Sequence, residues 1–326
     1  MIKINSYYSL IIISVLIASL NFIYKPAITD DINMYVSMYE RYQLGDYTFI
    51  QAFGRDCLVF ILFFILAKLG ISVSVGFFLI SFFTFFNILN SVFYHLKENN
   101  INLKKEYLFY LISILPIYLS FSGIRFSLGA SLIILGVILL NHSRKVGFLF
   151  LFLALLTHFS LSPFIVLYLF FGKFDFEISK TWKIIILSVF LVFFFYIMKQ
   201  DLKLRIIYYF FNDTVTWSYV FLKNKISFYF YWFIKFMWIP LYIGIYYFGK
   251  KIRFDRNTWL LILFTISFLP FMNIFYRYTQ ILCPFLFIIL FKEFYYNKKI
   301  CLLLFLPFFM NFMLDFYSII KINYTL

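Results

Sequence analysis

Long apolar runs, separated by short polar segments, recur along most of the chain. A helix that crosses a bilayer needs about 20 mostly apolar residues, with a range of about 17–25. Runs near that length lie at 8–24, 72–96, 107–122, 124–140, 146–171, 184–198, 228–248, 258–271, 278–291 and 300–317. Because a helix satisfies its own backbone hydrogen bonds in lipid, this pattern predicts an all-α polytopic membrane protein. We expect one transmembrane domain over 1–326.

Two runs differ from this simple pattern. The run at 57–69 is short, and short apolar runs are typical of re-entrant or interfacial segments, so it predicts a juxtamembrane helix on the outer face. The run at 146–171 holds His158 and Ser160 at its middle and has basic loops at both ends. It predicts two short helices that meet at an outer turn near 157–160, with one long tilted helix as the alternative. The total is about 10–11 transmembrane helices.

Composition and charge agree with a membrane protein. Hydrophobic residues make up 64% of the chain and charged residues 13%, whereas soluble domains carry about 25% charged residues. The net charge of +15 is explained by basic loops on the cytoplasmic side, so we expect no nucleic-acid partner. These loops are 96–106, 141–145, 172–183, 249–257 and 292–299. The same orientation places two long polar segments, 25–56 and 199–226, on the outer face.

The first outer segment contains a pair of acids and a row of aromatic residues. Apolar and aromatic side chains recur there at helical spacing, which predicts a short helix in the membrane interface. They are Met34, Tyr35, Met38, Tyr39 and Tyr42. Asp30 and Asp31 fit either a cap on that helix or a carboxylate that acts as a general base or binds sugar hydroxyls. Tyr35 and Tyr39 are candidate glycan-binding residues.

Arg125 stands at the predicted outer end of the span 124–140. Gly129 follows four residues later and shares its helix face. Such an arginine either extends its side chain to the interface or binds an anion. Small neighbours leave room for a ligand, and a guanidinium group matches phosphate oxygens bidentately. A diphosphate is therefore the natural candidate ligand.

His158 lies inside an apolar segment, in the sequence Thr157-His158-Phe159-Ser160. An ionisable side chain within a membrane segment is a functional-site hypothesis by default. Two roles fit it: a general base that takes a proton from a hydroxyl, or a hydrogen bond to phosphate.

The second half of the chain offers further basic and aromatic candidates on the predicted outer face. Lys203, Arg205 and Arg277 depart from the positive-inside rule, and capture of pyrophosphate would explain the departure. Trp217 and Tyr278 suit either stacking on sugar rings or anchoring at the headgroups.

Several signatures are absent from the sequence, among them a P-loop, a zinc-protease motif and a nucleophile elbow. There is also no Cys/His cluster with metal-ligand spacing. We expect no cofactor and no bound metal, with the pair Asp30 and Asp31 leaving metal dependence open. Transport driven by nucleotide hydrolysis within this chain is excluded.

Three of these segments together resemble the EpsG/Wzy-type polysaccharide polymerases. They are Asp30-Asp31 followed by Tyr35 and Tyr39, Ser122-Gly123-Ile124-Arg125 at the start of a helix, and Thr157-His158-Phe159-Ser160 at the end of a span. The resemblance covers about the first half of the chain, and Arg277 with Tyr278 is a looser match in the second half.

This resemblance implies a GT-C-like glycosyltransferase of the bacterial inner membrane. Such enzymes join undecaprenyl-diphosphate-linked oligosaccharide repeats on the periplasmic side into O-antigen, capsule or exopolysaccharide. Besides the lipid-linked substrate and the bilayer, the implied partner is a chain-length regulator protein. Other functions left open by the residues are a flippase or transporter for the same glycan, a ligase that moves polymer onto a lipid core, a membrane O-acyltransferase and a non-enzymatic scaffold.

Overall fold

The computed structural model describes residues 6–24, 31–46, 57–98, 108–140, 142–173, 261–262, 264–265, 272–294, 306–316 and 319. Within these ranges every secondary-structure element is helical, which confirms the all-α class. The chain divides into two compact units, one of Met1–Ile165 with Gln280–Leu326 and one of Val166–Thr279. The single domain expected over 1–326 stays a prediction. The predicted spans 184–198 and 228–248 and the outer segment 199–226 lie outside the described residues.

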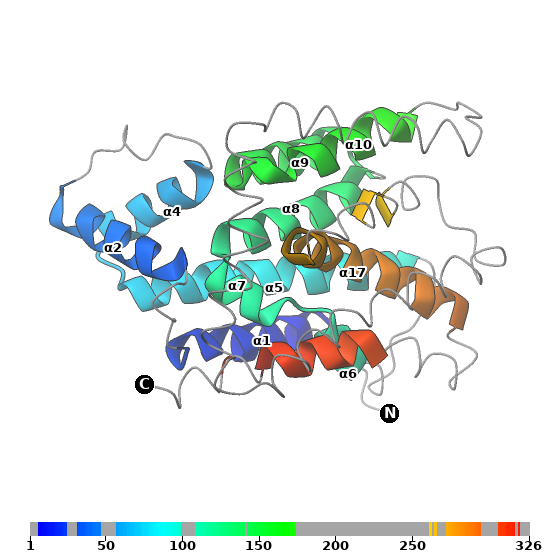
Figure 1. The fold of residues 1–326 in the computed structure, drawn as a ribbon, viewed down its shortest axis with the longest axis horizontal. Helices are drawn as coiled ribbons and strands as arrows, with labels where there is room; N and C mark the ends of the chain where they lie inside the picture. The colour runs from blue at the N-terminus through cyan, green and yellow to red at the C-terminus, as the bar shows by residue number, and fades with distance from the viewer. Residues whose placement is uncertain are drawn as a thin grey trace. The chain divides into compact units, whose positions relative to one another are not determined.

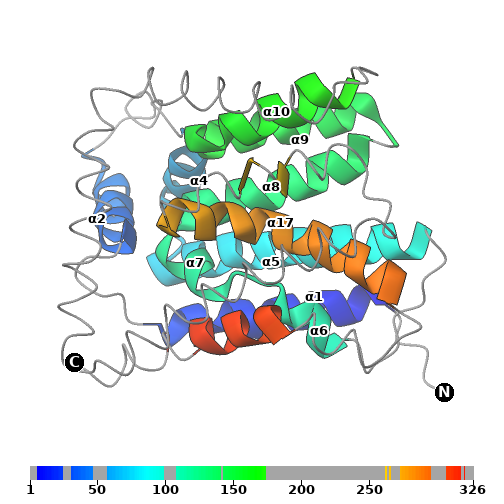
Figure 2. The ribbon, with the colours of Figure 1, turned by 45° about the vertical axis from the view of Figure 1, so that its right-hand side comes forward.

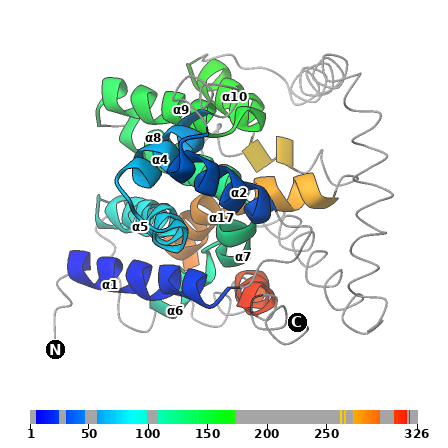
Figure 3. The ribbon, with the colours of Figure 1, turned by 90° about the vertical axis from the view of Figure 1, so that its left-hand side faces the viewer.

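The first unit is built around α5, which covers Val73–Glu98. Among the described helices, α5 is the one that is long and apolar enough to cross a membrane, by length and composition. The helix α1, Ser6–Ala18, continues through the 3-10 turn η1, Ser19–Phe22, and packs along α5 (Figure 3). Shorter apolar helices cover Tyr7–Phe22, Cys57–Lys68, Ile124–Leu140 and Leu306–Phe316. A total of 10–11 spans therefore stays a prediction.

The run at 107–122, expected to be one span, is broken in two. α6 covers Leu108–Ser113 and α7 covers Ile117–Ser122. The break falls at Pro116, because proline has no N–H for the helical ladder and disfavours helical geometry in the residue before it. The chain then passes through Gly123 into α8, Ile124–Leu140 (Figure 1).

The helix α9, Arg144–Thr157, returns along α8. Their close approach requires glycine: a Cβ added to Gly147 would lie 2.7 Å from the backbone nitrogen of Leu140. α9 ends at Thr157, a 3-10 turn η3 covers Phe159–Leu161, and α10 begins at Ser162 and ends at Lys173. The predicted break near 157–160 is confirmed.

Two short helices lie at the end of the first unit where α7 meets α8 (Figure 2). α2 covers Asp31–Leu44 and α4 covers Cys57–Lys68. The helix predicted from the aromatic row in the first outer segment is thus confirmed, as is a short helix in the run 57–69. α2 packs on α4, and α4 also contacts α9.

Large apolar side chains face outward on several helices of this unit, while the interior combines many apolar side chains with some small polar ones. On α1, Ile12 is 58% exposed and Leu16 63%, while Ser14 on the opposite face is fully buried. On α9, Phe152 is 56% exposed. Inside the bundle, the amide Nδ2 of Asn21 donates to Ser81 Oγ at 2.6 Å. These helices therefore carry large exposed apolar side chains, and interior hydrogen bonds link helices of the unit.

Candidate functional site

Arg125 lies in the first turn of α8 and is half-buried. Its Nε donates a hydrogen bond to the hydroxyl oxygen of Tyr35 at 2.6 Å. The guanidinium carbon lies 5.3 Å from the centre of the Tyr35 ring and 5.5 Å from that of Phe60. A hydrogen bond and cation–π contacts from helices α2 and α4 therefore help to hold the guanidinium group.

The aromatic row on α2 forms the buried face of that helix. Tyr35 is 1% exposed, and Tyr39 and Tyr42 are fully buried. The Tyr35 and Tyr39 rings contact Phe63 of α4 at centroid distances of 6.1 and 5.6 Å. In this arrangement neither ring presents a face to a sugar. Glycan binding by Tyr35 and Tyr39 stays a prediction, and it would require α2 to move away from α4.

The hydroxyl of Tyr39 anchors α2 at a second point. It donates to the backbone oxygen of Ile71 at 2.9 Å, and the side-chain amide of Gln43 donates to the same oxygen at 3.0 Å. Burial raises the pKa of the Tyr39 hydroxyl above its usual range, so the group keeps its proton and remains a donor. These bonds fix α2 against the segment between α4 and α5.

The space beside Gly129 is filled rather than open. A Cβ at this position would collide with Leu161 Cδ1 and would lie 3.5 Å from the backbone oxygen of Ala154. Gly129 therefore lets α8 approach the end of α9 and the turn η3. The expectation that it leaves room for a ligand is wrong, because tertiary packing places η3 there.

His158 adopts extended backbone geometry between α9 and η3, with φ −157° and ψ 109°. Its Nδ1 accepts a hydrogen bond from the backbone N–H of Ser160 at 3.3 Å and lies 2.7 Å from Ser160 Oγ. A backbone N–H can only donate, so Nδ1 is the unprotonated nitrogen and the proton of the neutral ring is on Nε2. This geometry favours a hydrogen-bond donor at Nε2 over a general base.

Phe126 lies between the two main candidate residues, Arg125 and His158. It follows Arg125 in α8, is 3% exposed, and its ring meets that of His158 edge-on at a centroid distance of 5.7 Å. One helical turn thus presents the arginine to α2 and α4 and holds the histidine ring in place. The predicted residues Arg125, Tyr35 and His158 are brought into one region of the first unit.

Other predicted site residues lie elsewhere in the structure or outside the described residues. Asp31 is the first residue of α2, whereas Asp30, Lys203, Arg205 and Trp217 lie outside the described residues.

Arg277 and Tyr278 were expected at a boundary between spans. They lie instead within a helix, because α17 begins at Met272 and ends at Phe294. Both residues belong to the second unit. Tyr278 is buried, with its ring 5.3 Å from that of Phe264.

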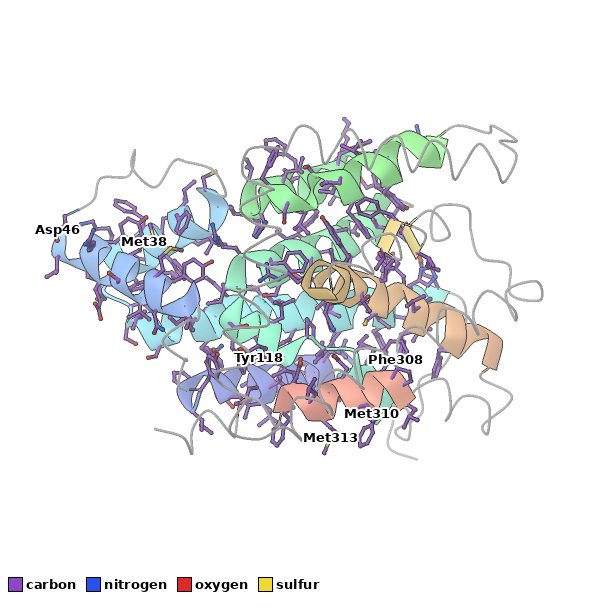
Figure 4. All side chains as sticks on the ribbon, in the orientation of Figure 1. Met38, Asp46, Tyr118, Phe308, Met310 and Met313 are labelled. Atoms are coloured by element: carbon purple, nitrogen blue, oxygen red, sulfur yellow. The ribbon has the colours of Figure 1, made fainter. Side chains whose placement is uncertain are left out.

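Sequence reasoning missed Asp315, which lies in the helix Leu306–Phe316. It is 2% exposed and is the only buried acid among the side chains whose surroundings the structure describes. Its Oδ2 accepts a hydrogen bond from the backbone N–H of Tyr118 at 3.2 Å, at the start of α7. Figure 4 shows Tyr118 near the helix that carries Phe308, Met310 and Met313. An acid within the apolar run 300–317 was the available signal.

Within the described residues, no group of three or more His, Cys, Asp or Glu side chains could hold a metal ion. Comparisons with protein-family models, with curated proteins and with solved structures give no match to this chain.

Proposed function

We propose that the chain is a polytopic protein of the bacterial inner membrane with a GT-C-like arrangement of helices. The outer side chains support this: Ile12, Leu16 and Phe152 face outward, while a largely apolar interior also holds small hydroxyl and amide groups that hydrogen-bond between helices. In lipid, outward apolar surface is well solvated, and helices associate through small residues and interhelical hydrogen bonds. The glycine contact between α8 and α9 fits the same mode of packing.

Within this membrane protein we propose a glycosyltransferase active on the periplasmic face. It joins undecaprenyl-diphosphate-linked oligosaccharide repeat units into O-antigen, capsule or exopolysaccharide. One observation carries the proposal: the guanidinium group of Arg125 is held in a defined orientation, and its neighbour Phe126 packs on a histidine whose Nε2 is a donor. Two donors of this kind suit an anionic leaving group such as a diphosphate.

In the proposed reaction, a hydroxyl oxygen of one lipid-linked glycan bonds to the anomeric carbon of another. The bond from that carbon to the diphosphate oxygen breaks, its electron pair leaves with undecaprenyl diphosphate, and the configuration inverts. Arg125 stabilises the charge that develops on the leaving group, and Nε2 of His158 donates a hydrogen bond to it. Asp30 or Asp31 accepts the proton of the attacking hydroxyl.

Residues of the second half are assigned supporting roles from the sequence. Diphosphate binding by Arg277, Lys203 and Arg205, and glycan binding by Trp217 and Tyr278, stay predictions of the sequence. The buried Tyr278 ring would have to leave Phe264 to meet a sugar. No cofactor enters this mechanism, because the arginines neutralise the leaving group.

The test uses purified protein in nanodiscs with its lipid-linked repeat unit and neither nucleotide nor ion gradient. We expect a ladder of longer glycans on a gel. Arg125→Ala should lower the rate by about 10²–10³, the usual effect of removing one charge-stabilising donor. Arg41→Ala is the matched control, because Arg41 is an exposed arginine on α2. Full-length polymer from Arg125→Ala at the wild-type rate would contradict the assignment.

A flippase for the same glycan is the second candidate, and the broken helix at Pro116 favours it. Discontinuous helices are typical of transporters, where they form the substrate site. The two functions separate in one experiment: a flippase moves the lipid-linked glycan between liposome leaflets and makes no ladder. A ligase would give product only when a lipid-core acceptor is added.

A further inference from the structure

Arg125 is oriented by an aromatic clamp, which we define as Tyr35 of α2 and Phe60 of α4. The Tyr35 and Phe60 rings lie 6.2 Å apart at an angle of 54°, and the guanidinium carbon is 5.3 and 5.5 Å from their centres. The Tyr35 hydroxyl binds Nε at 2.6 Å. Contacts from two rings and one hydroxyl restrict both the position and the rotation of the guanidinium plane.

The clamp is itself rigidly supported. Tyr35 is 1% exposed and packs on Phe63, which is fully buried. α2 is tied to the α4–α5 segment by the hydroxyl of Tyr39. A change at Tyr35 therefore acts on Arg125 without exposing a new surface to the ligand.

Orientation matters because arginine loses rotamer freedom when it binds an anion. Both Arg and Lys side chains carry substantial rotamer entropy, and a planar fork that is already oriented loses less per hydrogen bond. Immobilising one such side chain on binding changes affinity by about twofold to tenfold. A diphosphate gains more affinity from an oriented guanidinium group than a single phosphate does. It offers oxygens on two phosphate groups, and the spacing of these oxygens must match the nitrogen donors.

We propose that Tyr35 and Phe60 are positioning residues that set Arg125 for a diphosphate. With Nε bonded to Tyr35, an anion that binds while the clamp is intact does so along the edge formed by the terminal nitrogens. This inference rests on the proposed function, which assigns the diphosphate to Arg125. It gives Tyr35 a role other than the glycan contact expected from the sequence.

The experiment measures binding of inorganic pyrophosphate and of inorganic phosphate to the purified full-length protein in nanodiscs. Tyr35→Phe keeps the ring and removes the hydroxyl. We expect its pyrophosphate affinity to fall by about twofold to tenfold, with a smaller change for phosphate, so that selectivity falls. Phe60→Leu removes one ring contact and should act in the same direction.

Tyr42→Phe is the matched control. Tyr42 lies on the same helix, is fully buried, and packs its ring against Phe64 of α4 at 5.6 Å. It should leave pyrophosphate affinity and selectivity unchanged. A merely structural role for Tyr35 would lower the melting temperature and leave the pyrophosphate-to-phosphate selectivity as in the wild type.

The outcomes separate this inference from the proposed function. Loss of binding in Arg125→Ala with wild-type affinity and selectivity in Tyr35→Phe and Phe60→Leu would overturn the positioning role and leave the diphosphate site standing. Wild-type pyrophosphate binding in Arg125→Ala would overturn both. Reduced selectivity in Tyr35→Phe, with Tyr42→Phe unchanged, supports the clamp.

Discussion

At His158, a backbone N–H determines which ring nitrogen remains a hydrogen-bond donor. The hydrogen bond from Ser160 engages Nδ1, and the Phe126 ring restrains the imidazole from the side. The sequence left a general base and a phosphate donor as alternatives. The local geometry of the turn after α9 favours the donor.

The donor role predicts a specific substitution pattern. His158→Gln keeps an N–H donor and should retain more activity than His158→Ala, for which we expect a loss of about 10²–10³. Protonation of the ring leaves Nε2–H in place, so replacing His158 should not change how the rate depends on pH. The measurement is the polymerisation rate against pH for the three proteins.

His142→Ala provides the control for that series. His142 bonds Glu98 at 3.0 Å near the ends of α5 and α8, away from the turn at His158. A rate that falls with decreasing pH in the wild type but not in His158→Gln would identify His158 as a base and contradict the donor role.

Among the elements, α7 is bonded by a distant part of the chain. Pro116 at its N-cap makes no side-chain capping bond, and the N–H of Tyr118 is bonded instead by Asp315, 197 residues away. α7 leads through Gly123 directly into the turn that carries Arg125. The helix Leu306–Phe316 therefore helps to fix the start of α8.

This contact predicts different effects for two substitutions at Asp315. Asp315→Leu removes the acceptor of the partly buried Tyr118 N–H, which should destabilise the protein by about 1–3 kcal/mol. Asp315→Asn keeps an acceptor oxygen and should have a smaller effect. The measurements are thermal unfolding in nanodiscs and hydrogen exchange of the peptide 117–122, which should accelerate in Asp315→Leu. Equal exchange in both variants and the wild type would show that α7 does not depend on this bond.

For the whole molecule, the principal prediction is the orientation of α5 in the membrane. Ser37 on α2 and Lys97 at the end of α5 are both exposed, and the sequence places them on the outer and cytoplasmic sides. In spheroplasts, Ser37→Cys should react with a membrane-impermeant maleimide, and Lys97→Cys should react only after permeabilisation.

The native cysteines should contribute little to the labelling signal. Cys57 and Cys283 are buried, and Cys301→Ser removes the third cysteine of the chain. Labelling of both introduced cysteines from the outside would show that α5 does not carry the chain across the membrane.

Local sequence patterns were sufficient to predict the positions of several elements. The predicted run 124–140 coincides with α8, and the predicted span 72–96 lies within two residues of α5 at each end. The turn after Thr157 and the helix over Tyr35 were also predicted. Apolar run length, helical periodicity and interrupting polar residues are properties of neighbouring residues, so they can be read from the sequence.

The sequence by itself determined the helical class of the described residues, the positions of helices such as α5 and α8, and the choice of Arg125 and His158 as candidate residues. Only the tertiary structure decided what surrounds them: the Tyr35 hydroxyl on Arg125 from 90 residues away, Leu161 beside Gly129, and Asp315 on α7. Periodicity identifies the face of a helix that will be buried but not the helix that will cover it. That choice depends on contacts between distant segments, so only packing decided which groups surround Arg125 and His158.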